Sequence, residues 1–331
     1  MSQNALNMKN IVLLAGGWTE VYPSLKSAKK VESILTSSNI LTNFDFQSHG
    51  SDSLQLPNLN TLPQDSGVTI DSNQNIIDKI IHLDPANGLN ELRDDILRIQ
   101  PDIIVNLVHG YWGEDGYAQR FLDELKFPYT GPRFNDASIS INKHIMRSIC
   151  TKLNIPISSG GFYSEKKYRE KAHCYPHIVK PLFGGSSYGV HVINSDEEKD
   201  QYKMSDQAII CEEFIEGPEL CVVVKNGKCY GSMIIECEEQ FYTIHAKNTD
   251  KKVKFLGSES YVDQGMVKAA QEYAVGLYNY LDGHGIARID FKLSDKAYFI
   301  DYNSIPGMTL LPRILKFNNY SDSDFAKLLL E

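Results

Sequence analysis

Two short strands separated by a turn, within the stretch Arg288–Thr309, constrain the fold more than any other part of the sequence. Arg288–Leu293 alternates polar and apolar residues, and Tyr298–Asn303 does so more loosely. Ser294–Lys296 between them has the composition of a turn. The stretch therefore predicts a β-hairpin around which the rest of the chain is organised.

The polar side chains of this hairpin suggest a metal site. Successive side chains of a strand point to opposite faces, so Arg288 and Asp290 share a face of the first strand. Asp301 and Asn303 share a face of the second. If those faces lie together, two carboxylates and an amide oxygen meet beside a guanidinium, which suits Mg²⁺ and leaves positions for phosphate oxygens. The next turn, Ser304–Gly307, has N–H groups that could face an anion. An ordinary surface hairpin carries such residues too, so the metal interpretation needs a nucleotide site elsewhere in the chain.

Composition bounds the class of protein. The chain has 331 residues, 42% of them hydrophobic and 23% charged, as in globular proteins of two or three domains. A net charge of -9 argues against a nucleic-acid partner. The N-terminus lacks a secretory signal and no apolar run approaches the ~18 residues of a membrane span, so we expect a cytoplasmic location and no membrane partner. The six cysteines show neither a CxxC pair nor zinc spacing, so we expect free, partly buried thiols.

The N-terminal part alternates predicted strands and helices, which favours an open, mainly parallel sheet. Its first strand, Ile11–Ala15, ends in Gly16-Gly17 without the GxGxxG of a dinucleotide site. Residues 47–75 are rich in Ser, Asn, Asp and Pro, and we interpret them as an irregular insertion. The other expected elements are helices Ser24–Leu35, Asn90–Ile99 and Tyr117–Leu125 and strands Asn39–Phe46 and Ile103–Val108.

Two polar residues lie at the edge of this predicted sheet where α/β proteins bind ligands. Glu20 follows the first strand, and His109 opens the glycine-rich loop His109–Gly116 after a later strand. His109 is either part of a binding site or a structural loop histidine. Glu20 is either a substrate contact or a solvated side chain, which is the usual state of a lone glutamate.

A second glycine-rich segment, His177–Val190, predicts a phosphate-binding hairpin. An apolar strand carrying Lys180 runs into glycines and serines, and a second strand, Val190–Ile193, follows. Glycine N–H groups and serine hydroxyls can cradle phosphates, but the GK[ST] of a P-loop is missing. We therefore expect a hairpin loop that closes over phosphates. Upstream, a predicted helix Asn135–Leu153 carries Lys143, which on a helix is more often a solvated residue.

Three further segments precede the C-terminal hairpin. Ala208–Val224 predicts two strands joined through Glu-Glu-Phe-Ile, which could offer an acceptor and a backbone donor to a purine edge. A polar stretch follows, and Asn248–Ser258 has no periodicity, which suits a mobile loop. Met266–Leu281 is the clearest helix, and its apolar stripe indicates core packing.

The order of these motifs resembles the D-alanine–D-alanine ligase family of ATP-grasp enzymes. The motifs are Gly16-Gly17 with a nearby Glu, HGxxGEDG, YTG, a helix Lys, VKPxxxGSSxG, EEFxxGPE, a loop AK, RID and DxNxxPGMT. The resemblance runs from about residue 11 to the C-terminus and is poor over 47–100. It implies an α/β open-sheet domain (1–131), a central ATP-grasp subdomain with a glycine-rich lid (132–211) and an α+β C-terminal ATP-grasp subdomain with the metal site (212–331).

The resemblance also implies roles for individual residues. Lysines would hold phosphates, one glutamate the adenine amino group, another the ribose, and backbone groups the adenine edge. The residues expected at ATP are Lys143, Lys180, Ser186, Ser187, Glu212, Glu213, Ile215, Glu219 and Lys247. Those expected to bind two Mg²⁺ ions, with Mn²⁺ as an alternative, are Asp290, Asp301 and Asn303. Those expected at the amino-acid substrates are Glu20, His109, Arg288, Gly307 and Arg313, and those expected to serve the chemical step are Arg288, Gly307, Glu20 and Ser186.

The implied reaction joins two small amino acids, as in peptidoglycan biosynthesis. One carboxylate attacks the γ-phosphorus of ATP to give an acyl phosphate and ADP, and the second amine then expels phosphate. Each step concentrates negative charge, which Mg²⁺, lysines and Arg288 would stabilise. Loops must close, because an acyl phosphate hydrolyses in water. Family members are often dimers through the N-terminal domain, so a homodimer is expected on the resemblance alone.

Several positions depart from the family pattern, mostly in the substrate subsites. Asp301 replaces a Glu, Gly184 stands where the lid usually has Glu, and Asn248 replaces a Tyr. Pro312 stands where a serine normally binds the second carboxylate, and the neighbouring Arg313 could hold that carboxylate instead. Two alternatives therefore stay open: the same chemistry on another amino-acid or hydroxy-acid pair in a specialised pathway, and a nucleotide-binding regulatory protein that has lost ligation. A nicotinamide-dependent oxidoreductase is the interpretation that the sequence favours least.

Overall fold

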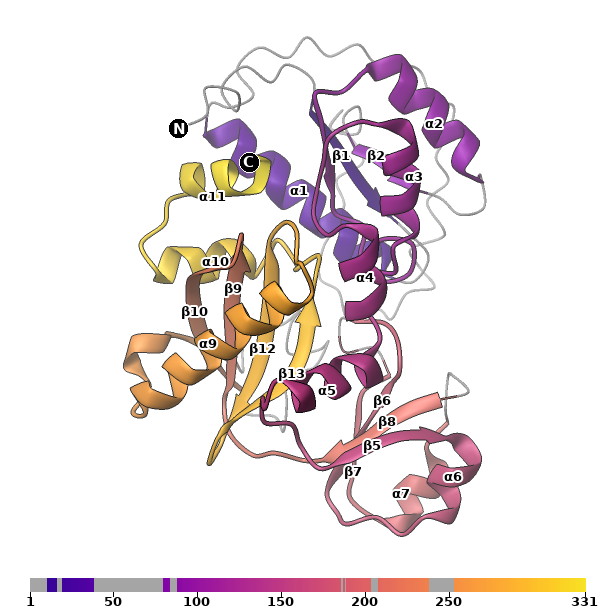
Figure 1. The fold of residues 1–331 in the computed structure, drawn as a ribbon, viewed down its shortest axis with the longest axis vertical. Helices are drawn as coiled ribbons and strands as arrows, with labels where there is room; N and C mark the ends of the chain where they lie inside the picture. The colour runs from indigo at the N-terminus through magenta and orange to yellow at the C-terminus, as the bar shows by residue number, and fades with distance from the viewer. Residues whose placement is uncertain are drawn as a thin grey trace.

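The computed structural model describes residues 11–16, 20–38, 80–83, 88–185, 187, 189–203, 208–237 and 253–331. The described strands form three sheets: a parallel sheet near the N-terminus, an antiparallel sheet in the middle of the chain and a five-stranded antiparallel sheet near the C-terminus (Figure 1). The expected strand Asn39–Phe46, the insertion 47–75, Ser186 and Lys247 lie outside the described residues.

The N-terminal sheet has the order β2-β1-β3-β4 with parallel pairing throughout. Its strands are β1 Ile11–Gly16, β2 Ile80–Leu83, β3 Ile103–Asn106 and β4 Tyr129–Thr130. Every residue of β1 is buried, because helices cover both faces of the strand. The odd-numbered residues of β1 pack against α1 (Val21–Ser37), while Val12 and Leu14 pack against α2 (Gly88–Ile99) and α3 (Tyr117–Leu125). The predicted open parallel sheet is confirmed.

The C-terminal sheet has the order β11-β10-β9-β12-β13 and is antiparallel. One face packs on α9 (Gln264–Tyr280) and the other on α10 (Leu311–Phe317), which is followed by α11 (Asp322–Leu330). The predicted hairpin forms its last two strands. The strands are β9 Glu219–Lys225, β10 Lys228–Cys237, β11 Val253–Gly257, β12 Ala287–Leu293 and β13 Ala297–Asn303.

One hydrophobic core joins the N-terminal sheet to the C-terminal helices. Phe325 and Leu329 of α11 are buried in the same cluster as Ile11 of β1 and Val31 of α1. The first and last helices of the described chain therefore lie side by side (Figure 1). This shared core fixes the N-terminal domain against the C-terminal sheet.

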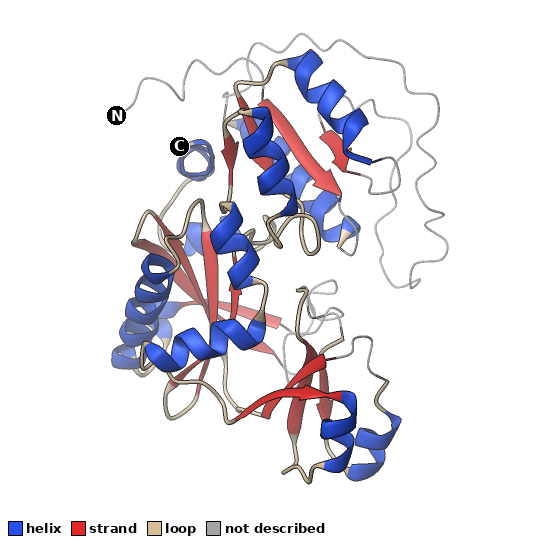
Figure 2. Ribbon diagram, turned by 45° about the vertical axis from the view of Figure 1, so that its right-hand side comes forward, coloured by secondary structure: helices blue, strands red, loops and turns tan. Residues whose placement is uncertain are grey.

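The central sheet, of order β5-β8-β6-β7, has a separate core. Its two short helices lie on one side of the sheet, away from the other two sheets (Figure 2). Buried Tyr168, Val179 and Tyr202 belong to this core. Strands β6 and β7 pair antiparallel, so the glycine-rich segment between them is a hairpin loop, as predicted. The elements are β5 Gly160–Ser164, α6 Glu165–Glu170, β6 His177–Pro181, β7 His191–Ile193, α7 Asp196–Gln201 and β8 Ala208–Glu213.

The prediction of one helix over Asn135–Leu153 is wrong, because the segment forms two helices. These are α4 (Phe134–Ser140) and α5 (Lys143–Lys152). Asn142 has extended backbone between them, and its side chain accepts hydrogen bonds from the N–H groups of His144 and Ile145. An asparagine N-cap of this kind starts a new helix. By its packing α5 belongs beside the C-terminal sheet, so the domain boundaries at 131 and 211 stay a prediction.

The prediction of a loop over Asn248–Ser258 is wrong for its second half. Val253–Gly257 forms β11, an edge strand paired with β10, and Phe255 opposes Ile235. The pairing comes from a distant strand, which local periodicity does not reveal. Ser258–Ser260 continues as a turn of 3₁₀ helix. Within the described ranges, no helix has the length and apolar character needed to cross a membrane.

Candidate active site

The hairpin β12–β13 brings its four polar residues onto one face. Arg288 lies opposite Asn303 and Asp290 opposite Asp301. The guanidinium of Arg288 donates to both carboxylate oxygens of Asp290, at 2.8 Å each. The amide nitrogen of Asn303 donates to Asp290 Oδ2 at 2.9 Å and to the carbonyl of Arg288 at 3.2 Å. The predicted arrangement of two carboxylates, an amide and a guanidinium is confirmed.

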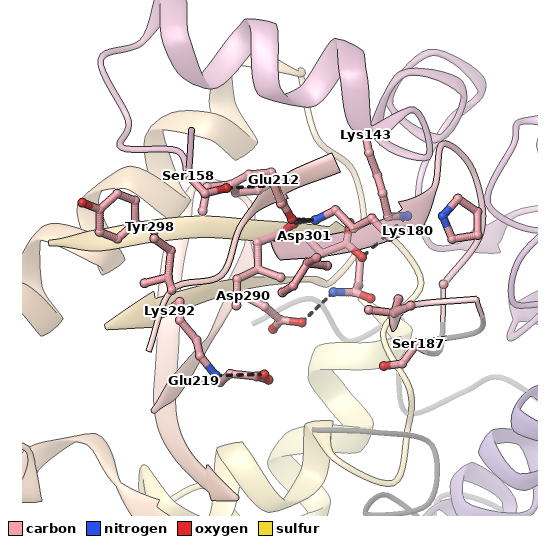
Figure 3. A pocket seen from close by; sticks show the side chains of 18 of the residues that line it. Lys143, Ser158, Lys180, Ser187, Glu212, Glu219, Asp290, Lys292, Tyr298 and Asp301 are labelled. Carbon is pink, nitrogen blue, oxygen red and sulfur yellow. Dashed lines mark hydrogen bonds and ion pairs between the residues drawn. The ribbon is translucent and has the colours of Figure 1, made fainter. Parts of the chain in front are cut away.

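A cavity opens between this hairpin and the central sheet (Figure 3). Lys143 and Lys180 enter it from α5 and β6, and Lys143 Nζ lies 3.9 Å from Asp301 Oδ2. Apolar side chains of Ile178, Phe183 and Ile215 cover other parts of its wall. Cations, acids and an apolar surface thus meet in one space. The site residues predicted from the sequence that line this cavity are Lys143, Lys180, Ser187, Glu212, Glu213, Ile215, Glu219, Arg288, Asp290, Asp301 and Asn303.

The carboxylate of Glu212 is held by three partners at one end of the cavity. It pairs with Lys180 Nζ, and its other oxygen accepts from Arg147 at 2.5 Å and from the hydroxyl of Ser158 at 2.9 Å. Burial raises the pKa of Glu212, but the charges of Lys180 and Arg147 and the hydrogen bonds outweigh it, so the pKa lies below its ordinary value. Glu212 is therefore ionised at neutral pH and fixes Lys180 in place.

Glu219 and Glu213 lie further along the same wall. Glu219 pairs with Lys292 at 3.6 Å. The side chain of Glu213 accepts from the Ser159 hydroxyl at 2.8 Å, and its backbone N–H donates to the Ser159 carbonyl. A backbone donor at this wall therefore has to come from a neighbouring residue.

The glycine-rich loop contacts the N-terminal domain through Glu20. Buried Glu20 accepts a hydrogen bond from the N–H of Gly185 at 3.0 Å. The ammonium of Lys143 donates to the carbonyl of Gly184. Glu20 of the N-terminal domain and Lys143 of α5, which packs beside the C-terminal sheet, therefore both contact the loop of the central sheet. Glu20 is not a solvated side chain.

His109 is buried and is linked through Ser27 to the turn that follows the hairpin. Its Nε2 lies 2.9 Å from the hydroxyl of Ser27, which accepts from the N–H of Met308 at 3.1 Å. Burial lowers the pKa of His109 to about 4, so the imidazole is neutral at physiological pH. Its position fixes the turn that contains Gly307 against α1.

A family model described as D-ala D-ala ligase C-terminus matches residues 155–331. The D-alanine–D-alanine ligase of Pelagibacter ubique (strain HTCC1062) is 30% identical over 262 residues, which cover 76% of this chain and 85% of that protein. The chain belongs to the D-alanine–D-alanine ligase family. Another relative with the same name, from Aquifex aeolicus (strain VF5), is 29% identical over 72% of this chain and 84% of its own length.

Solved structures of D-alanine–D-alanine ligases share the fold. The enzyme from Bacillus anthracis superposes with a TM-score of 0.69 and 21% identity, over 97% of this chain and 96% of that one. A structure of that enzyme complexed with ATP has a TM-score of 0.68 and 20% identity, over 98% of this chain and 96% of that one. The predicted N-terminal open sheet followed by an ATP-grasp fold is confirmed.

Two residues predicted from the family pattern, Gly307 and Arg313, lie beyond the hairpin, in the turn after β13 and in α10. Gly307 follows β13 in the turn that begins α10, and its carbonyl accepts from the N–H groups of Leu310 and Leu311. The guanidinium of Arg313 stacks over the ring of Phe255 at 4.0 Å from the centroid. Arg313 is not among the described residues that line the cavity, so its role as a carboxylate ligand stays a prediction.

Sequence reasoning missed three residues around the candidate site. Arg147 and Ser158 donate hydrogen bonds to the carboxylate of Glu212, and Ser158 also lines the cavity. Glu114 accepts from the N–H of Gly110 at 2.7 Å and from that of Ile305 at 3.4 Å. Burial and the neighbouring charge of Glu20 raise its pKa to about 8. One signal was available, because Arg147 lies one helical turn after Lys143 and therefore on the same face of α5.

Proposed function

We propose that this chain is an ATP-dependent ligase that joins two molecules of D-alanine through an acyl phosphate. The observation that carries the proposal is the cavity in which Lys143 and Lys180 face the Arg288–Asp290–Asp301–Asn303 hairpin, in a member of the D-alanine–D-alanine ligase family. Cations on one wall and hard oxygen ligands on the other are the surroundings that phosphoryl transfer requires.

ATP would lie between the central and C-terminal sheets. Lys143 and Lys180 would contact its phosphates, and Lys180 is already oriented by Glu212. Glu212 would also face the adenine amino group, and Glu219 the ribose. Because the N–H of Glu213 is taken up by Ser159, a backbone donor to the adenine ring falls to Ile215. Ser186, Ser187 and Lys247 complete the proposed set around the phosphates.

The hairpin suits Mg²⁺, with Mn²⁺ as an alternative and two ions expected. Asn303 directs its amide nitrogen to Asp290 and to the carbonyl of Arg288, which leaves its amide oxygen facing away from those partners. Asp290 and Asp301 line the same cavity as this amide. Hard oxygen donors of this kind are the ligands that Mg²⁺ prefers. When bound, the ion would neutralise charge on the phosphates.

The first D-alanine would lie between Glu20, His109 and the glycine-rich loop. The carboxylate of Glu20 would receive its ammonium, and neutral His109 would border the same subsite. The substrate carboxylate would then attack the γ-phosphorus of ATP. The N–H of Gly185 in the loop already donates to Glu20, so the carboxylate that would bind the substrate also holds the loop closed. A closed loop would keep water from the acyl phosphate.

The second D-alanine would attack the acyl carbonyl with its amine and expel phosphate. Arg288, held in place by its double contact with Asp290, and the N–H of Gly307 would stabilise the negative charge that develops on the carbonyl oxygen. A homodimer through the N-terminal domain belongs to this proposal as an expectation from the family.

One observation favours a second candidate, the same chemistry on a different amino-acid or hydroxy-acid pair. Pro312 stands in the first turn of α10, where the family pattern has a serine for the second carboxylate, and proline offers no donor. A second substrate without the usual carboxylate contact would suit this position.

The test is ATP-dependent phosphate release by the full chain with Mg²⁺, over D- and L-amino acids and hydroxy acids, singly and in pairs. We expect release with D-alanine alone and D-alanyl-D-alanine as the product in mass spectra. Release only with another pair would replace D-alanine by that pair. Binding of ATP without release for any pair would overturn ligation and favour a regulatory protein.

A further inference from the structure

A cluster of metal-binding side chains lies on the central sheet, on the face opposite the cavity. It consists of His173 in the segment before β6, His177 at the start of β6, and Cys211 in β8. One ring nitrogen of each histidine and the sulfur of Cys211 all lie within 4.8 Å of one another. Because successive side chains of a strand alternate, Cys211 points away from the cavity into which Glu212 points.

Hydrogen bonds fix the proton of each imidazole on the side away from the cluster centre. Nδ1 of His177 lies 3.0 Å from the carbonyl of Cys174, and Nε2 of His173 lies 3.1 Å from the carbonyl of Tyr168. A carbonyl only accepts, so these nitrogens carry the N–H. The other nitrogen of each ring therefore presents a lone pair, and that of His173 lies 3.5 Å from Cys211 Sγ. Histidines that bind metals are usually oriented by such a bond to a carbonyl.

We propose that His173, His177 and Cys211 bind one Zn²⁺ ion, a site separate from that for ATP and its Mg²⁺. Two imidazole nitrogens and one thiolate are a borderline-soft donor set that suits zinc and not magnesium. Zinc bonds to nitrogen and sulfur are about 2.0 and 2.3 Å long, so the ligand atoms need to move inward by roughly 1 Å. A water molecule would complete the tetrahedral shell.

The protonation states fit this binding. Burial lowers the pKa of both histidines, which keeps their lone pairs available at neutral pH. Burial raises the pKa of Cys211 to about 12, so the ion must displace the thiol proton. Binding therefore converts the thiol and free ion into a zinc thiolate and one released proton.

Tyr168 is the local competitor for the ion. Its hydroxyl lies 3.0 Å from Nε2 of His177 and donates to the lone pair that zinc would use. Zinc binding requires this hydroxyl to turn away. Removing the hydroxyl should therefore leave the zinc affinity unchanged or raise it. If the cluster serves only as a hydrogen-bonded core, removing the hydroxyl should not strengthen metal binding.

The experiment titrates the full chain, without a histidine tag and stripped by a chelator, first with Co²⁺ and then with Zn²⁺. We expect one Co²⁺ to bind per chain and to give the visible bands of tetrahedral coordination and a near-ultraviolet thiolate-to-cobalt band. Added Zn²⁺ should displace the Co²⁺ and remove all of these bands. Absence of saturable binding or of the thiolate band would overturn the proposal.

Variants assign the signal to the cluster. Cys211→Ser should abolish the thiolate band, and His173→Gln, at a half-buried position that tolerates substitution better, should weaken Co²⁺ binding by at least about tenfold. Tyr168→Phe should bind as tightly as the parent or more tightly. Cys229→Ser, which changes a cysteine of β10 outside the cluster, is the matched control and should bind normally. Unchanged binding in His173→Gln, or loss of the band in Cys229→Ser, would contradict the assignment.

Discussion

Two glutamates beside the cavity, Glu212 and Glu114, have pKa values that are shifted in opposite directions. Burial by itself would raise the pKa of each, and the neighbouring charges decide the net shift. The cations Lys180 and Arg147 outweigh burial and lower the pKa of Glu212, whereas the acid Glu20 adds to burial and raises the pKa of Glu114 to about 8. Glu212 is therefore a fixed charge, and Glu114 carries its proton at neutral pH. Burial alone therefore does not determine whether Glu212 or Glu114 is charged.

The pH dependence of stability follows from these directions. Because the pKa of Glu212 is lowered by folding, its contribution is present above the unfolded pKa and is lost as pH falls through the folded value. Because the pKa of Glu114 is raised, its contribution is present below the unfolded pKa and is lost as pH rises through about 8. The two acids thus favour the folded state in different pH ranges.

The largest expected effect is that of Arg147→Met. It removes one of the two cations from a buried carboxylate and should lower the free energy of unfolding by about 3–5 kcal/mol. Urea unfolding at pH 7 measures the loss. The control Arg120→Met removes an exposed ion pair with Glu124 and should cost at most about 0.5 kcal/mol. A loss no larger than in the control would mean that Lys180 alone lowers the pKa of Glu212.

Lys180→Met tests the other cation. Lys180 lines the cavity, whereas Arg147 is not among the described lining residues. We expect the rate of ATP-dependent phosphate release to fall by roughly 10²- to 10³-fold, because the phosphates lose a preorganised charge. Lys268→Met, at an exposed position of α9, should keep the parental rate. Near-parental turnover in Lys180→Met would show that its charge serves Glu212 and not the nucleotide.

Glu114→Gln tests the opposite glutamate. The amide resembles the protonated acid, so stability below about pH 4.5, where the acid is protonated in both states, and activity below pH 7 should stay close to those of the parent. Between about pH 5 and 8 the parent should lose stability as the unfolded chain releases a proton that the folded protein keeps, and the variant should lose less. Unfolding curves at several pH values measure the difference. Parallel pH profiles for parent and variant would refute the raised pKa.

The smallest expected effect is that of Ser158→Ala, which removes a hydroxyl donor from the ionised carboxylate of Glu212 and keeps both cations. We expect a loss of about 1.5–2 kcal/mol in unfolding free energy, as for a hydrogen bond to a charged group. Ser138→Ala, at a half-buried site on α4 whose hydroxyl donates to the carbonyl of Asn135 in the same helix, is the control. A loss as large as in Arg147→Met would show that the hydroxyl, and not the charges, determines the state of Glu212.

Much of the fold and part of the site could be predicted because they depend on local patterns. Alternation placed Arg288 with Asp290 on one face of the first strand and Asp301 with Asn303 on one face of the second, and the register of the hairpin joins the two faces. Strands ending in glycines indicated the edge at which Glu20 lies. The split at Asn142 was missed, because an asparagine within a helical pattern caps a helix only when the chain around it turns.

The parts that could not be predicted depend on contacts between distant residues. Arg147 and Glu212 lie 65 residues apart, and no periodicity connects them. The same holds for His173 and Cys211, which are 38 residues apart and lie together beside the pairing of β6 with β8. Edge strand β11 likewise exists because β10 offers it a partner. Ser186 and Lys247 stay predictions.

The core that α11 shares with β1 and α1 has a consequence for synthesis in the cell. The first domain leaves the ribosome long before Phe325 and Leu329, which complete its apolar interior, have been translated. Domains generally fold from the N-terminus as they are made, but this one stays incomplete until α11 emerges. Nascent chains should therefore expose the unfilled side of α1 to chaperones until α11 has been translated, and loss of α11 should impair the first domain more than the central sheet.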